Sequence, residues 1–352
     1  MDRGSQATGE TIRLYSPGSA PKIVAIGGGH GLSTMLRGIK QYSRDITAIV
    51  TVADDGGGSG MLRKDLGMLP PGDARDCVLA LANTEPVMEQ LMTYRFSEGS
   101  GTLTGQNFGN LLLAALNGIC GSFSDAVRTM GEVLAITGRV LPVTEEDVFL
   151  QAQFDDGSTV LGESKIFYYK KDTRRRIRRV TLLPEHPEAF PESLAAIARA
   201  DLILIGPGSL YTSIIPNFLV SGITEAVASS KAYKLMIMNL MTQDGETEDY
   251  TAGDHLRELL RHSDAGAVDA VLANSSPVPD HLRAEYIREG ANVLEIDREN
   301  VEAQGVPLFT APMLSEVSEY ARHDPALLAQ AIMDLWRREG RDTVRLRRRG
   351  YL

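Results

Sequence analysis

Two glycine clusters in the chain occupy positions that favour the binding of an anion. The first, Gly27 to Gly31, follows a short apolar run and opens an amphipathic segment, and the second, Gly206 to Ser209, repeats this arrangement. A turn between a strand and a helix presents bare backbone amides and the positive end of the helix dipole to a ligand. We therefore predict phosphate contacts from both loops, at Gly27, Gly28, Gly29, His30, Gly31, Gly206, Pro207, Gly208 and Ser209. The alternative for the first cluster is structural, with the glycines only turning the chain tightly under the sheet.

An acidic pair, Asp54 and Asp55, follows the second apolar run and precedes the segment GGGSG. Two adjacent carboxylates could hold Mg²⁺ that keeps water and phosphate ligands, or they could accept hydrogen bonds from a sugar or a base. The alternative is structural, with Asp54 capping a turn and Asp55 solvated. Glycines such as Gly57 favour a ligand site, because this flexible backbone can move over a bound molecule.

A third candidate site is the amide motif TGQNFGN, which contains Asn107, Gly109 and Asn110. Amides at the amino end of a helix can read a polar ligand, although Asn110 could equally be a structural cap. The apolar helix that follows is expected to be buried between layers. Arg63 and Arg75 are candidate phosphate partners, and an ordinary salt bridge explains either of them equally well.

The sequence lacks the motifs of several common enzyme and metal-site classes. The dinucleotide fingerprint GxGxxG counted from Gly27 needs a glycine where Leu32 stands, and no P-loop is present. Ser209 is not part of a GxSxG nucleophile motif. The six histidines form no HExxH pattern, and the two cysteines, Cys77 and Cys120, form no CxxC pair. These absences disfavour a dehydrogenase, a serine hydrolase and a zinc site.

The elements that must position these residues alternate between apolar strands and amphipathic helices. Strands are predicted over 22–26, 46–52, 201–205, 234–240 and 268–274, and each ends in glycine or polar residues. Continuous apolar strands that alternate with helices indicate a mostly parallel sheet buried on both faces. We predict a Rossmann-like three-layer α/β/α fold.

The predicted organisation is one α/β domain over 21–338 with an inserted antiparallel β-ribbon over about 147–183. Residues 1–20 are polar and are predicted to be a disordered extension, and residues 339–352 are predicted to be a basic tail. The basic runs over 170–179 and 337–349 are interpreted as solvated, because no aromatic residues are interleaved with them as in nucleic-acid-binding surfaces.

The composition is that of an ordinary globular protein. The chain has 352 residues, a net charge of -10 and 43% hydrophobic residues. It has no recognisable signal peptide and no apolar run long enough to cross a bilayer. With its few cysteines, this predicts a cytoplasmic protein with neither a membrane span nor a nucleic-acid partner.

Six motifs in order, GGGHGL, VADDGGGSG, PPGDAR, GQNFGNLLLAAL, IGPGSLYTSIIPN and NLMTQDGET, resemble the gluconeogenesis factor family. These bacterial cytoplasmic proteins are related to the 2-phospholactate transferase that builds the deazaflavin coenzyme. The resemblance covers about residues 22–338. It implies a ligand site across the strand ends, binding of a nucleotide sugar such as UDP-N-acetylglucosamine, and regulation of carbon metabolism and of cell-wall synthesis or cell shape.

No reaction is established for this family, so the resemblance implies no required cofactor and no assigned catalytic residue. Its transferase relatives use Mg²⁺ and carry a guanine nucleotide product, so a Mg²⁺-dependent transferase with metal at Asp54 and Asp55 is the alternative. Protein partners in cell-wall synthesis and a homo-oligomer are open expectations. The resemblance also covers the segment YARHD, which makes Arg322 a candidate for nucleotide binding.

The motifs carried over by resemblance are the glycine loop, the acidic pair, the amide motif and the second glycine loop, at the residues named above. Three positions depart from the family pattern. His30 stands where threonine is usual, Gly58 where serine is usual, and Gln106 where histidine is common. The change at Gln106 removes a titratable group, which weakens any mechanism that needs a general acid or base there.

Overall fold

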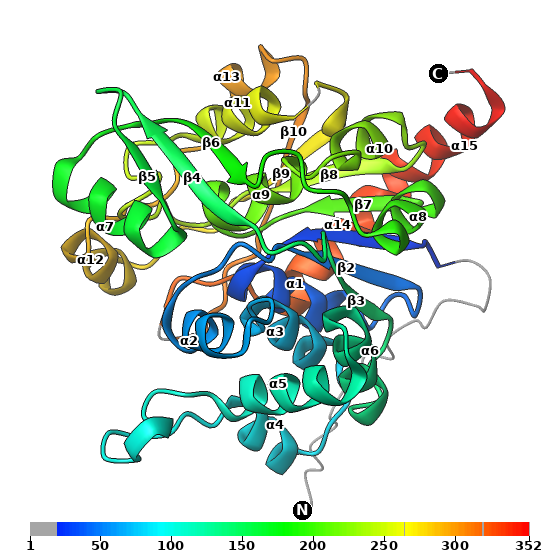
Figure 1. The fold of residues 1–352 in the computed structure, drawn as a ribbon. Helices are drawn as coiled ribbons and strands as arrows, with labels where there is room; N and C mark the ends of the chain where they lie inside the picture. The colour runs from blue at the N-terminus through cyan, green and yellow to red at the C-terminus, as the bar shows by residue number, and fades with distance from the viewer. Residues whose placement is uncertain (1–19, 264, 319, 352) are drawn as a thin grey trace, which may run out of the picture.

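The computed structural model describes residues 20–351 except 264 and 319. Within them, seven parallel strands form the main sheet in the order β10-β9-β8-β7-β1-β2-β3 (Figure 1). The strands are β1 (Ile23–Gly27), β2 (Ile46–Val50), β3 (Arg139–Pro142), β7 (Leu202–Ile205), β8 (Tyr233–Ile237), β9 (Ala270–Asn274) and β10 (Leu308–Ala311). The predicted extension, residues 1–20, lies outside the described residues except for Ala20.

Helices cover both faces of this sheet (Figure 1). One face is covered by α1 (Gly29–Ile39), α3 (Gly72–Leu81) and α14 (Pro325–Leu335), and the other by α8 (Pro191–Arg199), α10 (Ile223–Ser229) and α11 (Ala252–His262). The other helices include α2 (Gly57–Leu66), α4 (Pro86–Thr93), α5 (Phe108–Cys120), α6 (Phe123–Val133), α9 (Ile215–Phe218), α12 (Asp280–Arg288) and α13 (Arg298–Glu302). The predicted three-layer α/β architecture is therefore confirmed.

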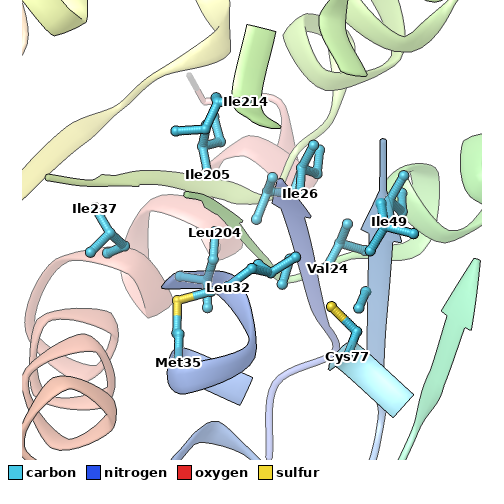
Figure 2. Close-up of a cluster of buried hydrophobic side chains, with 14 of the residues drawn as sticks. Val24, Ile26, Leu32, Met35, Ile49, Cys77, Leu204, Ile205, Ile214 and Ile237 are labelled. Carbon is cyan, nitrogen blue, oxygen red and sulfur yellow. The ribbon is translucent and has the colours of Figure 1, made fainter. Parts of the chain in front are cut away.

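The core explains why the strands are apolar along their whole length. Every residue of β1, β2 and β8 is buried, as expected for parallel strands covered on both faces. In Figure 2, Val24 and Ile26 of β1 lie among side chains from neighbouring strands, and Leu32 and Met35 approach from α1. This packing fixes the amino end of α1 against the carboxyl end of β1, where the first glycine loop lies.

The inserted ribbon is only partly as predicted. Strands β4 (Phe149–Phe154), β5 (Thr159–Leu161) and β6 (Ile177–Leu183) form an antiparallel sheet in the order β5-β4-β6. Between β5 and β6, however, the chain forms helix α7 (Glu163–Thr173). Gly162 ends the strand with φ +103°, and Ile166 and Lys170, one helical turn apart, bury the same face of the helix.

The expectation that the apolar helix after the amide motif is buried between layers is wrong. Only Gly109, Asn110 and Leu113 of α5 are buried, and Ile119 is 79% exposed. The helix packs on α4 and α6 outside the layer formed by α3. Among the described residues no single helix has the length and apolar character to cross a bilayer, and only α5 and α6 taken as a pair, bent by 118°, pass that test.

Most described residues of the predicted basic carboxyl-terminal tail are exposed, as expected, but ion pairs attach the segment to the fold. Residues Arg341–Arg349 form helix α15. Both guanidinium NH groups of Arg347 bind the Asp269 carboxylate, at 2.7 and 2.6 Å, and Arg348 pairs with Asp201 at 2.7 Å. Because the two aspartates lie just before β9 and β7, α15 is attached to the amino ends of the parallel strands, opposite the glycine loops.

Candidate ligand-binding site

The two glycine loops meet at the carboxyl ends of β1 and β7. A Cβ atom on Gly31 would lie 2.6 Å from the carbonyl oxygen of Pro207, and one on Gly208 would lie 3.1 Å from the carbonyl oxygen of Gly28. Only glycine permits this approach of the two backbones. The order of strands reverses direction between β1 and β7, and open α/β sheets bind their ligands at such a switch point.

In the first loop, the amino end of α1 already faces an anion supplied by the chain. The Gly29 amide donates a hydrogen bond to Asp73 Oδ1 at 2.9 Å, and a Cβ on Gly28 would collide with the same carboxylate. Burial, followed by the charge of Asp54, raises the pKa of Asp73 to about 7. A phosphate bound at this loop would therefore share it with a carboxyl group of the protein.

In the second loop, the hydrogen-bond donors of the backbone and of Ser209 already have acceptors, which are side chains from the segment that follows β8. The Gly208 amide donates to Asn239 Oδ1 at 3.0 Å, and Ser209 Oγ donates to Gln243 Oε1 at 2.5 Å. The amides of Tyr211 and Thr212 both donate to Glu246 Oε1 at 3.0 Å. Burial raises the pKa of Glu246 to about 7.

Next to these loops lies a pocket of about 320 Å³ that we call the acidic pocket, lined by Asp54, Gly56, Gly57, Glu163, Ser164, Ile166, Phe167, Tyr168, Thr212, Gln243, Gly245 and Glu246. Among these described residues there is no lysine or arginine. Asp54 Oδ1 accepts a hydrogen bond from the Gly56 amide at 2.8 Å. Burial, then the neighbouring carboxylates of Asp54 and Asp73, raise the pKa of Glu163 well above its usual range.

A second pocket, of about 240 Å³, shares Gln243 with the first and has the opposite character. We call it the arginine pocket; it is lined by His30, Gly31, Thr34, Pro207, Asn239, Leu240, Met241, Thr242, Gln243, Tyr286, Ala321, Arg322 and His323. None of these described residues is acidic, and Arg322 is exposed. His323 is buried with no hydrogen-bond partner at Nε2, and burial lowers its pKa to about 4, so it is neutral.

The two aspartates of the acidic pair have different surroundings. Asp54 faces the acidic pocket, whereas Asp55 Oδ1 accepts a hydrogen bond from the Ser164 amide at 2.9 Å, at the amino end of α7. Asp55 thus holds the wall of the pocket in place. The described residues contain no group of three or more histidine, cysteine or acidic side chains arranged to hold a metal ion.

The amide motif lies apart from both pocket linings. Asn107 caps α5 by accepting a hydrogen bond from the Asn110 amide at 3.1 Å. A Cβ on Gly109 would lie 2.7 Å from the carbonyl oxygen of Met92, so this glycine allows α4 and α5 to pack closely. Buried Asn110 Oδ1 has no hydrogen-bond partner.

Both candidate arginines form ion pairs within the protein. Arg63 is buried, donates to the Val148 carbonyl at 2.6 Å and pairs with Asp147 at 2.6 Å, which ties α2 to the inserted ribbon. Arg75 pairs with the neighbouring Asp76 at 2.5 Å. Of the two alternatives open from the sequence, the structure thus shows the salt bridge in both cases.

Four side chains of the site were not assigned to it from the sequence: Asp73, Glu163, Glu246 and Tyr286. Asp73 follows the turn residues PPG, and this pattern predicts the start of a helix but not a ligand site. Glu163 lies in the segment predicted as ribbon. The sequence predicts a loop after β8, but nothing in its pattern indicates that Glu246 contacts the segment after β7.

Replacing Asp73 by asparagine is expected to flatten the pH dependence of stability. An unfolded aspartate has a pKa of about 3.9, so between that pH and about 7 the folded protein binds more protons than the unfolded chain. The free energy of unfolding contributed by Asp73 therefore falls as pH rises through this window. Asparagine keeps an acceptor for the Gly29 amide without a charge.

Thermal unfolding followed by circular dichroism between pH 5 and pH 8 measures this effect. The midpoint of the wild type should fall more across the range than that of Asp73→Asn. Parallel curves for the two proteins would show that Asp73 titrates as it does in the unfolded chain.

The fold and the cleft define a Rossmann-like α/β protein with a two-part polar cleft at the strand switch point. The family model for "2-phospho-L-lactate transferase CofD" matches residues 23–314. A relative from Thermoanaerobacterium thermosulfurigenes is 49% identical over 317 residues, covering 90% of this chain and 97% of the relative. The gluconeogenesis factor of Bacillus subtilis is 46% identical over 318 residues, covering 90% and 99%.

A crystal structure of a protein from Bacillus halodurans superposes with a TM-score of 0.85 at 44% identity, covering 89% of this chain and 99% of that protein. The chain therefore belongs to the gluconeogenesis factor family, which shares its family model with 2-phospho-L-lactate transferase. The resemblance found in the sequence motifs is thereby confirmed.

Proposed function

We propose that this protein binds a nucleotide sugar of the UDP-N-acetylglucosamine type and acts as a regulator that links carbon metabolism to cell-wall synthesis and cell shape. The observation that carries the proposal is the contrast between two adjoining pockets, one lined by three carboxyl groups and one containing Arg322 and no acid. A nucleotide sugar has the matching division, with an anionic diphosphate at its centre and an uncharged sugar at one end.

In this arrangement the diphosphate lies at the arginine pocket. Arg322 is exposed there, with its guanidinium 5.2 Å from the centre of the Tyr320 ring, and Gly31 and Pro207 bring the joined glycine loops to the same pocket. The Gly29 and Gly208 amides already have acceptors, so Arg322 supplies most of the favourable charge. The sugar lies toward Asp54, which can accept hydrogen bonds from its hydroxyl groups.

A Mg²⁺-dependent transferase acting on a nucleotide diphospho-substrate is the second candidate, favoured by the match to the transferase family model. Asp54 fits a Mg²⁺ ion held mainly by substrate phosphates, since such ions commonly use only one or two protein carboxylates. Such an ion would offset charge on the phosphates. The residues do not fit a metal held by the aspartate pair, because Asp54 lines the acidic pocket and Asp55 does not.

Titration calorimetry with UDP-N-acetylglucosamine, with and without EDTA, separates the two functions. We expect affinity to survive EDTA nearly intact and no released nucleotide to accumulate when Mg²⁺ and acceptors are added. This follows if Arg322, and not a metal, neutralises the diphosphate. Binding that EDTA abolishes and Mg²⁺ restores would instead favour the transferase.

A further inference from the structure

The acidic pocket brings together carboxyl groups from three separate parts of the chain. Asp54 follows β2, Glu163 begins α7, and Glu246 lies in the segment between β8 and α11. Asp73 adds a fourth carboxyl group, whose charge helps to raise the pKa of Glu163. With no lysine or arginine among its described lining residues, the only charge that this lining can present to a ligand is negative.

One of these groups has an atom without a partner. The Glu246 side chain is buried, with the residue 3% exposed, and its Oε1 accepts the amides of Tyr211 and Thr212. Its Oε2 has no hydrogen-bond partner. A buried polar atom without a partner is costly, so a ligand hydroxyl group that pairs with Oε2 gains binding free energy.

The protonation of the pocket adds to this preference. Burial raises the pKa of Glu246 to about 7, and burial, followed by the charges of Asp54 and Asp73, raises the pKa of Glu163 well above its usual range. The Glu246 carboxyl group therefore exchanges between an acceptor and a donor near neutral pH, and hydroxyl groups can pair with either form. A carboxylate on the ligand would add a further negative charge to this buried cluster.

We propose that Glu246 and Glu163 select the terminal sugar by charge, so that the acidic pocket accepts an uncharged sugar and rejects one that carries a carboxylate. This inference rests on the proposed function, because it requires a nucleotide sugar to span the two pockets. It assigns specificity to two residues that contact the sugar and not the nucleotide.

The comparison of UDP-glucose with UDP-glucuronate tests the proposal, because the two ligands differ only in the oxidation of the sugar at C6. We expect the wild type to bind UDP-glucose at least thirtyfold more tightly in titration calorimetry at pH 7.5. In Glu246→Gln the ratio should fall below fivefold. Glutamine keeps an acceptor for the two amides, and taking the ratio removes any loss of affinity common to both ligands.

Glu163→Gln provides a second variant, should Glu246→Gln not fold, and it should also lower the ratio. Glu289→Gln is the matched control on the exposed surface of the segment after α12, and should retain the wild-type ratio. Equal binding of the two sugars by the wild type, or a ratio unchanged in both pocket variants, would overturn the charge selection while leaving nucleotide-sugar binding intact. Absence of binding by UDP and by both UDP-sugars would overturn the proposed function and this inference together.

Discussion

Replacing Arg322 by alanine is expected to weaken UDP-N-acetylglucosamine binding at least tenfold. Arg322 is the one lysine or arginine among the described residues that line the arginine pocket. A hydrogen bond to a charged partner contributes roughly 1.5 to 3 kcal/mol, and tenfold in affinity corresponds to about 1.4 kcal/mol. Titration calorimetry of the purified variant measures the change.

Two further variants sharpen this test. Arg322→Lys keeps the charge but loses the planar fork of donors, so it should recover only part of the affinity. Arg283→Ala removes an exposed arginine of α12 that does not line the pocket, and should bind as the wild type does. A folded Arg322→Ala variant with unchanged affinity would place the phosphates elsewhere in the cleft.

Replacing Lys170 by alanine is expected to lower the free energy of unfolding by about 3 to 5 kcal/mol. Lys170 Nζ lies 2.5 Å from Glu248 Oε2, and each side chain is only 8% exposed. Removing the lysine leaves a buried carboxylate without its closest counter-charge, which costs far more than the pair itself contributes. Denaturation in urea, followed by circular dichroism, gives the free energy of unfolding.

The neighbouring Lys171→Ala is the matched control for this change. Lys171 pairs with Asp244, but its side chain is 46% exposed and Arg174 also faces that carboxylate. Its loss should therefore cost much less stability than the loss of Lys170, as for other exposed ion pairs. The double variant Lys170→Met, Glu248→Gln removes both charges and keeps an acceptor for the buried Gly245 amide, so it should recover most of the lost stability. A double variant as unstable as Lys170→Ala would show that the charge imbalance is not the cause.

Much of the fold follows directly from the sequence, because fully apolar strands in a parallel sheet leave a clear local signal. The strand predicted over 46–52 is observed as Ile46–Val50, and that over 268–274 as Ala270–Asn274. The glycine loops were also located correctly in the chain. A glycine run directly after a buried strand indicates a tight turn, because the chain must change direction where the strand ends.

The composition of the site was less predictable, because it depends on contacts between distant segments. Glu163 reaches Asp54 only because α7 folds back over the cleft, and the salt bridge of Lys170 with Glu248 keeps it there. The basic run over 170–179 is predicted to be solvated, because nothing in its local sequence indicates that Lys170 has a buried partner, Glu248. Glu246 similarly became part of the site through the amides of the π-helical turn after β7.

The central position of β1 has a consequence for how the protein is made. β1 pairs with β2 on one edge and with β7 on the other, and the contact between Lys22 and Asp201 beside it joins residues 179 apart in the chain. During translation, β1 and β2 leave the ribosome early, but the second edge of β1 waits for β7 to be synthesised. An apolar strand with an open edge can pair with other chains, so this interval is when aggregation competes with folding. The yield of folded protein should therefore depend on the rate of elongation between these two strands and on the chaperones that shield β1 in the meantime.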